Sequence, residues 1–190
     1  MTRPRPLHGV RVAILVDDGF EQVDLTSPRE ALHAAGATTM LVSPQTESVC
    51  GWSGVEKDES FRVDVAIADA KPTEFDALLI PGGLRSADSL RICNKAVLFV
   101  HAMQIGRKPI AAICHAPWVL IETDYVRGRK VTSSPSLRTD LTNAGAVWED
   151  RPVVTDELLV TSQTAADLPQ FNDAAIVLFT PRSSKVKDAS

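Results

Sequence analysis

A short apolar run that ends abruptly at a cysteine is the feature that most constrains how this chain can fold. The run, Ile110 to Ile113, is too short for a helix, and an apolar helical pattern begins at Pro117, just beyond Cys114 and His115. Proline suits the first turn of a helix, because its missing N–H costs nothing there. The succession predicts a buried strand, a sharp turn that carries Cys114, and a helix, as in a nucleophile elbow with Cys in place of Ser.

Comparable apolar runs alternate with helical patterns along the chain. Arg11–Val16, Thr38–Ser43 and Asp76–Ile80 are continuous apolar segments, as expected for parallel strands that are covered on both faces. Between the first two, a capping-box pattern over 27–30 predicts that the helix kinks or restarts at Pro28. We therefore expect an α/β fold, a doubly wound and mostly parallel sheet with helices on both faces.

The length of the chain suits one domain. Its 190 residues are enough to bury a core, and the alternating pattern extends over residues 11–179. The Pro- and Arg-rich segment 1–10 is expected to be a flexible arm, and the segment 180–190 a polar tail.

Composition excludes several classes of function. The net charge of −4 argues against binding to nucleic acid or to an anionic membrane surface, and no run of 18 apolar residues is present to span a membrane. The first residues lack the apolar core of a secretory signal. The cysteines Cys50, Cys93 and Cys114 are scattered without metal-ligand spacing, so we expect reduced thiols in a cytoplasmic protein, with no metal and no cofactor.

Three loops are expected to meet at one edge of the sheet, because each follows the carboxyl end of a parallel strand. They span Asp17–Glu21, Pro81–Asp88 and Cys114–His115. The partial positive charge of a helix N-terminus favours the thiolate over the thiol, so a lowered thiol pKa is expected. A protonated Glu21 facing the thiol would favour the thiolate further by donating a hydrogen bond.

Backbone amides complete the expected site. Those of Gly82 and Gly83, with those at the start of the helix after Cys114, are placed to form an oxyanion hole. A cysteine with a nearby histidine and carboxylate is the general arrangement of a thiol hydrolase.

These residues resemble the PfpI-type intracellular protease family, in the branch of the class I glutamine amidotransferase-like superfamily that includes the Parkinson-associated protein. The resemblance covers residues 11 to about 179, and it implies a flavodoxin-like, glutamine amidotransferase-like fold. The matching stretches are Asp18–Glu21, Phe75–Gly83, Ala112–Trp118, Arg127–Lys130, Ser134–Leu141 and Asn143–Gly145.

The resemblance implies roles for particular residues. Cys114 would be the nucleophile, Glu21 its carboxylic acid partner and His115 the adjacent base. Gly83 and the backbone of His115 would be the oxyanion donors. Asp88 matches the position of an acid that reaches the site of a neighbouring subunit, which implies a homodimer with the active site near the interface. Asp124 replaces a glycine that commonly ends the helix after the elbow, so a left-handed conformation is expected there.

Several interpretations remain open from the sequence alone. The leading hypothesis is a stress-response cysteine hydrolase that acts on peptides. The alternatives are a glyoxalase or deglycase acting on methylglyoxal or its adducts, and a redox sensor or chaperone without turnover that responds through oxidation of Cys114. His115 can instead simply line the pocket, Glu21 can be a charge stabilised by a helix N-terminus, and Asp88 can be a solvated loop acid or a helix cap.

Overall fold

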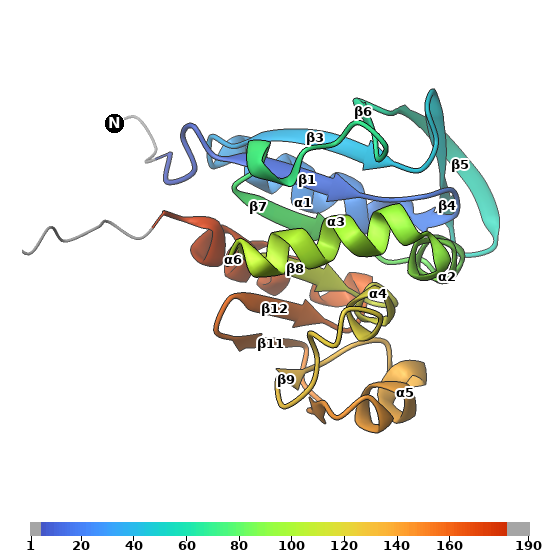
Figure 1. Cartoon of the computed structure of the whole chain (residues 1–190), viewed down its shortest axis with the longest axis vertical. Coiled ribbons are helices and arrows are strands. Elements are labelled where there is room, and N and C mark those ends of the chain that lie inside the picture. Colours follow the sequence, from blue (N-terminus) through green and yellow to red (C-terminus); the bar gives the residue numbers. More distant parts are fainter. Residues whose placement is uncertain (1–4, 182–190) are drawn as a thin grey trace, which may run out of the picture.

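A seven-stranded sheet forms the centre of the protein, for which a computed structural model describes residues 5–181 (Figure 1). The strand order is β11-β12-β8-β7-β1-β3-β6, and every pair is parallel except β11 with β12. The strands are β1 (Arg11–Leu15), β3 (Thr38–Ser43), β6 (Val65–Ala66), β7 (Ala77–Ile80), β8 (Ile110–Ile113), β11 (Val153–Asp156) and β12 (Leu159–Ser162). The fold is therefore the α/β class that the sequence predicts.

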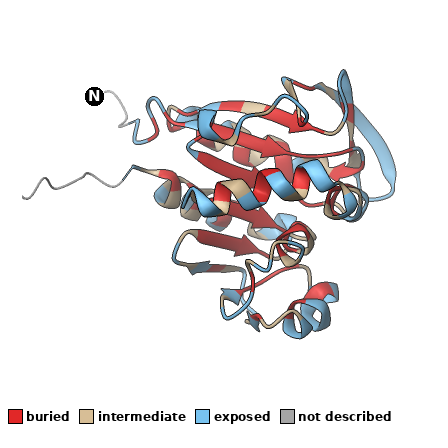
Figure 2. Cartoon of the chain, viewed as in Figure 1, coloured by how far each residue is buried: buried red, intermediate tan, exposed pale blue. Residues whose placement is uncertain are grey.

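Helices cover both faces of this sheet. One apolar cluster joins α1 and α6 to one face through side chains such as Leu25, Phe171 and Ile14, and the other cluster joins the remaining helices to the opposite face. In the burial map the central strands are almost wholly buried while the helices expose one side (Figure 2). The helices are α1 (Gln22–Ala34), α2 (Leu84–Ile92), α3 (Asn94–Ile105), α4 (Pro117–Ile121), α5 (Arg138–Asn143) and α6 (Leu168–Phe179).

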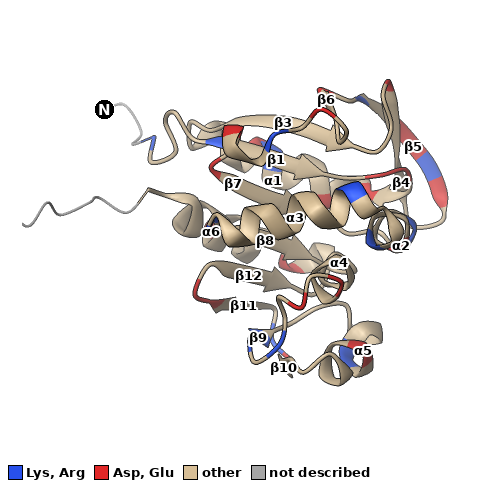
Figure 3. Cartoon of the chain, viewed as in Figure 1, with Lys and Arg blue, Asp and Glu red and all other residues tan. Residues whose placement is uncertain are grey.

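Two small sheets and three short turns of 3-10 helix complete the described chain. β4 and β5 form an antiparallel hairpin, and β2 pairs with β4 in parallel. β5 carries charges of both signs on its exposed surface (Figure 3). The remaining elements are β2 (Phe20–Glu21), β4 (Ser48–Ser53), β5 (Glu56–Arg62), β9 (Lys130–Val131), β10 (Val147–Trp148), η1 (Pro72–Glu74), η2 (Pro135–Leu137) and η3 (Ala165–Asp167).

Helix α1 differs from the sequence prediction in a way that matters for the site. No break occurs at Pro28; the helix is continuous from Gln22 and Pro28 lies inside it. Proline lacks an N–H, so the carbonyl of Asp24, four residues earlier, loses its usual helical donor. The side chain of Pro28 is buried, and packing of the apolar face offsets the lost hydrogen bond.

Helix α2 is not evident from the sequence pattern. The segment after Gly83 is a loop in the sequence prediction, but it is helical from Leu84 to Ile92, so Asp88 lies within a helix and does not cap one. The next helix, α3, begins at Asn94, and Cys93 occupies its capping position.

Part of the expected N-terminal arm packs against the domain. Leu7 is fully buried, and its N–H donates to the carbonyl of Ala35 at 3.0 Å. Residues 1–4 of the arm and 182–190 of the tail lie outside the described residues. Within residues 5–181, no helix has both the length and the apolar character needed to cross a membrane.

Candidate active site

The carboxyl ends of three neighbouring strands bring the expected loops together. β7 lies between β1 and β8, with Ile14 opposite Leu79 and Ile80 opposite Ala112. Because all three strands are parallel, the segments that follow them emerge at the same sheet edge. The backbone confirms their contact, since the N–H of Glu21 donates to the carbonyl of Gly82 at 3.0 Å.

Cys114 occupies a strained turn between β8 and α4. Its φ is +62°, a left-handed conformation that is uncommon for a residue with a side chain and costs on the order of 1–2 kcal/mol. Neighbouring segments hold this conformation in place: the Cys114 N–H donates to the carbonyl of Ser162 at 3.0 Å, and its carbonyl accepts from the N–H of Ser134 at 2.8 Å. The strand, sharp turn and helix predicted from the sequence are confirmed, and so is the left-handed Asp124, with φ +55°.

The thiol of Cys114 differs from its expected state. Burial raises its pKa to about 12, and the nearby carboxylates of Asp24 and Glu21 also act to raise it. Backbone hydrogen bonds from Gly83 and His115 lower the pKa, but by less. Helix α4 has only five residues and begins at Pro117, beyond the turn, so its N-terminus does not offset burial. The resting group is a neutral thiol at neutral pH.

His115 lies directly beside this thiol. Its Nδ1 is 3.2 Å from the sulfur of Cys114, and its Nε2 is 3.3 Å from the hydroxyl oxygen of Ser136. The ring is half-buried, and burial lowers the pKa of the imidazole below its ordinary value of 6.5. The imidazole is therefore neutral at neutral pH and can accept a proton from the thiol at Nδ1.

Glu21 has a different hydrogen-bond partner from the one expected. Its carboxylate accepts the N–H of Gly54 at 3.3 Å, in the turn between β4 and β5. Among the described hydrogen bonds none joins Glu21 to Cys114, and its charge is the weakest of the influences on the thiol pKa.

Asp24 is the acid that sequence reasoning missed. It lies in the first turn of α1 with 1% of its surface exposed, and neither carboxylate oxygen makes a hydrogen bond of normal geometry among the described residues. Burial, together with the charge of Glu21, raises the pKa of Asp24 from 3.8 to about 7, and the backbone N–H of Gly82 opposes this shift only in part. The carboxyl group is thus protonated through the acidic range up to about pH 7. Asp24 follows Glu21 by three residues, a spacing that places both acids on the same face of a continuous helix. Because the sequence pattern predicts a break at Pro28, it does not assign Asp24 to the site.

Gly82 separates Asp24 from Cys114. A side chain at this position would collide with a carboxylate oxygen of Asp24, and its Cβ would lie 2.6 Å from the Cβ of Cys114. Gly83, with φ +106°, packs as closely against the backbone of Gly19, Phe20 and Glu21. The two glycines therefore let the acidic turn, the thiol and the buried acid approach one another.

Of the other predicted residues, Gly83 and His115 contact the thiol through their backbone, and Asp88 does not. The N–H groups of Gly83 and His115 face the sulfur of Cys114, where they are available to a reacting oxygen. Asp88 is exposed on α2, and no described hydrogen bond involves its side chain. Within the described part of a single chain, no hydrogen bond joins Asp88 to the thiol or the imidazole.

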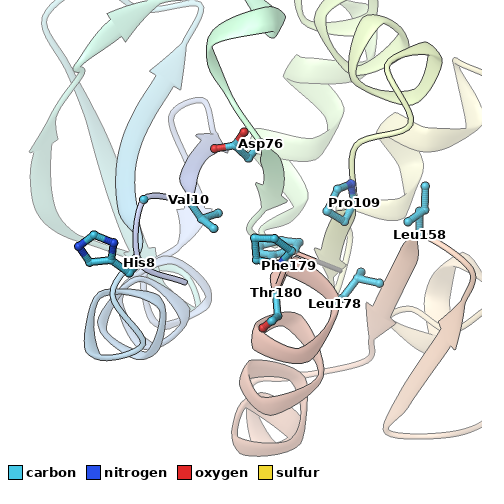
Figure 4. A pocket seen from close by; sticks show the side chains of 10 residues that line it. His8, Val10, Asp76, Pro109, Leu158, Leu178, Phe179 and Thr180 are labelled. Carbon is cyan, nitrogen blue, oxygen red and sulfur yellow. The ribbon is translucent and has the colours of Figure 1, made fainter. Parts of the chain in front are cut away.

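Two cavities lie at opposite edges of the sheet. One, of about 350 Å³, is lined in part by Asp18 and Gly19 of the acidic turn and by Arg85 of α2. The other, of about 410 Å³, lies at the amino ends of β1, β7, β8 and β12, at the sheet edge opposite Cys114 (Figure 4). No cluster of three His, Cys, Asp or Glu side chains suited to a metal occurs in the part of the chain that the structure describes.

Comparison with known proteins supports a family relationship over almost the whole chain. The DJ-1/PfpI family matches residues 10–177. The chain is 41% identical over 169 residues to "Putative cysteine protease YraA" of Bacillus subtilis, covering 88% of this chain and 97% of that protein. It is 40% identical over 169 residues to "Protein/nucleic acid deglycase 2" of Escherichia coli, covering 88% and 96%.

Solved structures show the same relationship. A two-domain protein from Anabaena variabilis, with DJ-1/ThiJ/PfpI-like and ferritin-like domains, matches at a TM-score of 0.84 and 32% identity. That match covers 95% of this chain and 52% of the other. Drosophila melanogaster DJ-1beta matches at a TM-score of 0.81 and 25% identity, covering 90% and 91%. The protein belongs to the DJ-1/PfpI family.

Proposed function

We propose that the protein is a Cys114-dependent hydrolase of small reactive carbonyl compounds, methylglyoxal or its adducts, of the glyoxalase or deglycase type. The observation that carries this proposal is the neutral thiol held 3.2 Å from a neutral imidazole. A neutral thiol adds readily to an aldehyde if a base removes its proton during the attack, so a preformed thiolate is not required.

The reaction starts with addition. The Cys114 sulfur bonds to the aldehyde carbon, the thiol proton moves to Nδ1 of His115, and the carbonyl electron pair moves onto oxygen. The N–H groups of Gly83 and His115 are available to stabilise this oxyanion. Return of the proton from Nδ1 to the oxygen gives a hemithioacetal.

Hydrolysis completes the sequence. For methylglyoxal, a proton moves from the former aldehyde carbon to the adjacent carbonyl carbon. The hydroxyl proton of the hemithioacetal moves to the oxygen of that adjacent carbon, and the former aldehyde carbon becomes the carbonyl of a lactate thioester. Water then cleaves the carbon–sulfur bond, restoring the thiol and releasing lactate. One water is consumed and no external oxidant is needed, because one carbon is oxidised as its neighbour is reduced.

Asp24 is assigned the role that the family resemblance implies for Glu21. Its carboxyl group stays protonated up to about pH 7 and lies across Gly82 from Cys114. A protonated carboxyl in that position favours a thiolate leaving group by hydrogen-bond donation, whereas an ionised one would repel it. We infer that Asp24 assists release of the sulfur in the final step.

Peptide hydrolysis is the second candidate, and the similarity to a protein named as a putative cysteine protease supports it. The half-buried thiol and the close contacts around Gly82 favour a small substrate over a polypeptide. The redox-sensor hypothesis receives less support, because peroxide oxidises the thiolate and the raised pKa keeps that species scarce. A homodimer that brings Asp88 to the neighbouring site is retained as part of the proposal.

The test compares substrates on matched variants. We expect wild-type protein to consume methylglyoxal and form lactate, Cys114→Ala to lose this activity, and Cys50→Ala and Cys93→Ala to retain it. Equal rates for wild type and Cys114→Ala would refute the proposal. Release of casein peptides in the absence of methylglyoxal consumption would favour the protease instead.

A further inference from the structure

We propose that Ser136 is the positioning residue for His115, so that thiol, imidazole and hydroxyl form a relay within a single chain. The inference rests on the proposed function, because it assigns the group that prepares His115 to act as base.

The distances define the relay. Nδ1 of His115 lies 3.2 Å from the Cys114 sulfur, and Nε2 lies 3.3 Å from Oγ of Ser136. Oγ of Ser136 is in turn 3.0 Å from Oγ of Ser134. Both ring nitrogens therefore have a defined partner: the reacting thiol at Nδ1 and the hydroxyl of Ser136 at Nε2.

The chemistry fixes the direction of the hydrogen bonds. To accept the thiol proton, Nδ1 of His115 must be unprotonated, so the neutral ring carries its proton on Nε2. That N–H donates to Oγ of Ser136, whose own proton is free to donate to Ser134. When the thiol proton arrives at Nδ1, the Nε2 proton stays in place, and no proton leaves through Ser136.

The backbone places Ser136 with little freedom. Pro135 begins the 3-10 turn that carries it, and the N–H of Ser134 donates to the Cys114 carbonyl at 2.8 Å. The serine segment is thus bonded to the same strained turn that carries the thiol. On another side the ring of Trp118 packs edge-on against His115, at 6.0 Å between centroids.

A hydroxyl partner also fits the electrostatics of His115. A carboxylate on Nε2 would raise the imidazole pKa, whereas burial beside neutral serines leaves it lowered. Ser136 therefore selects the tautomer and the ring orientation without adding charge.

The experiment combines a spectroscopic and a kinetic measurement on the full chain. Nitrogen NMR of the labelled imidazole is expected to show the Nε2–H tautomer of His115 in wild type and a mixture of tautomers in Ser136→Ala. We expect kcat/KM for methylglyoxal to fall about tenfold in Ser136→Ala, the lower end of the range for losing a group that orients a metal-bound histidine. Ser136→Thr, which keeps the hydroxyl, should restore most of both properties.

Thr139→Ala is the matched control, because Thr139 is exposed on the adjacent helix. It should leave both the tautomer and the rate unchanged. An unchanged tautomer in folded Ser136→Ala would overturn the relay whether or not the protein turns over methylglyoxal. Failure of wild type to consume any carbonyl compound, with the tautomer shift intact, would instead refute the proposed function and leave the positioning role standing.

Discussion

The raised pKa of the buried Asp24 carboxyl can be tested by measuring how Asp24→Asn changes the stability of the fold. The carboxyl group is 1% exposed, and burial with the charge of Glu21 raises its pKa from 3.8 to about 7. The folded protein therefore holds this proton more tightly than the unfolded chain does. Asp24 costs no stability below about pH 3.8, and its cost grows until the pH passes about 7.

The magnitude follows from the two pKa values. At about 1.4 kcal/mol per pKa unit, ionised Asp24 destabilises the fold by about 4 kcal/mol above pH 7. The amide of the Asp24→Asn variant does not titrate, so the free energy of unfolding of this variant relative to wild type should increase by about that amount between pH 4 and pH 8.

Urea denaturation of both proteins across this pH range measures the difference. Glu30→Gln is a suitable control, because this acid is exposed on the same helix and does not contribute to the shifted pKa of Asp24. A difference between wild type and Asp24→Asn that stays constant with pH would show that Asp24 ionises normally, and the assignment of a protonated acid beside Cys114 would fail.

Three further predictions concern the elbow and its surroundings. Cys114→Gly should be more stable than Cys114→Ala by about 1 kcal/mol in urea denaturation, since glycine adopts φ +62° without the steric cost; equal stabilities would show that the turn is unstrained. Gly82→Ala should lose about 1–3 kcal/mol of unfolding free energy, because its methyl group meets Asp24 and Cys114, and it should also lose activity. Gly128→Ala is the control and should keep its activity, because a Cβ there meets nothing within 4 Å at φ +73°. A loss of activity in Gly128→Ala as large as that in Gly82→Ala would contradict the steric explanation. Finally, because the pKa of His115 is lowered from its ordinary 6.5, the acid limb of kcat/KM for methylglyoxal should have its midpoint below pH 6.5; a midpoint above pH 6.5 would show a base with a raised pKa.

Much of the architecture could be predicted because it depends on local patterns. Four-residue apolar runs that end at Pro81-Gly82-Gly83 and at Cys114 identify β7 and β8, and a cysteine shortly before Pro117 identifies the elbow. The site residues Cys114 and His115 follow from the same reasoning, since any group at the end of a central parallel strand faces the crevice.

The parts that escaped prediction depend on tertiary packing. Pro28 indicates a helix break locally, yet burial of α1 against the sheet keeps the helix continuous and carries Asp24 into the core. The raised pKa of Cys114 reflects partial burial by segments that are distant in the sequence, which no local pattern reports. Ser136 lies 21 residues beyond His115, and only the path of the chain around α4 brings its hydroxyl to the imidazole.

The protonation state of the Cys114 thiol in the free protein is the central claim. It can be measured by thiolate ultraviolet absorbance during a pH titration of the Cys50→Ala/Cys93→Ala double variant, which leaves Cys114 as the single thiol. The structure predicts that thiolate appears only well above the usual thiol pKa of about 8.5. A midpoint below that value would establish a preformed thiolate and contradict the transfer of the thiol proton to His115 during attack.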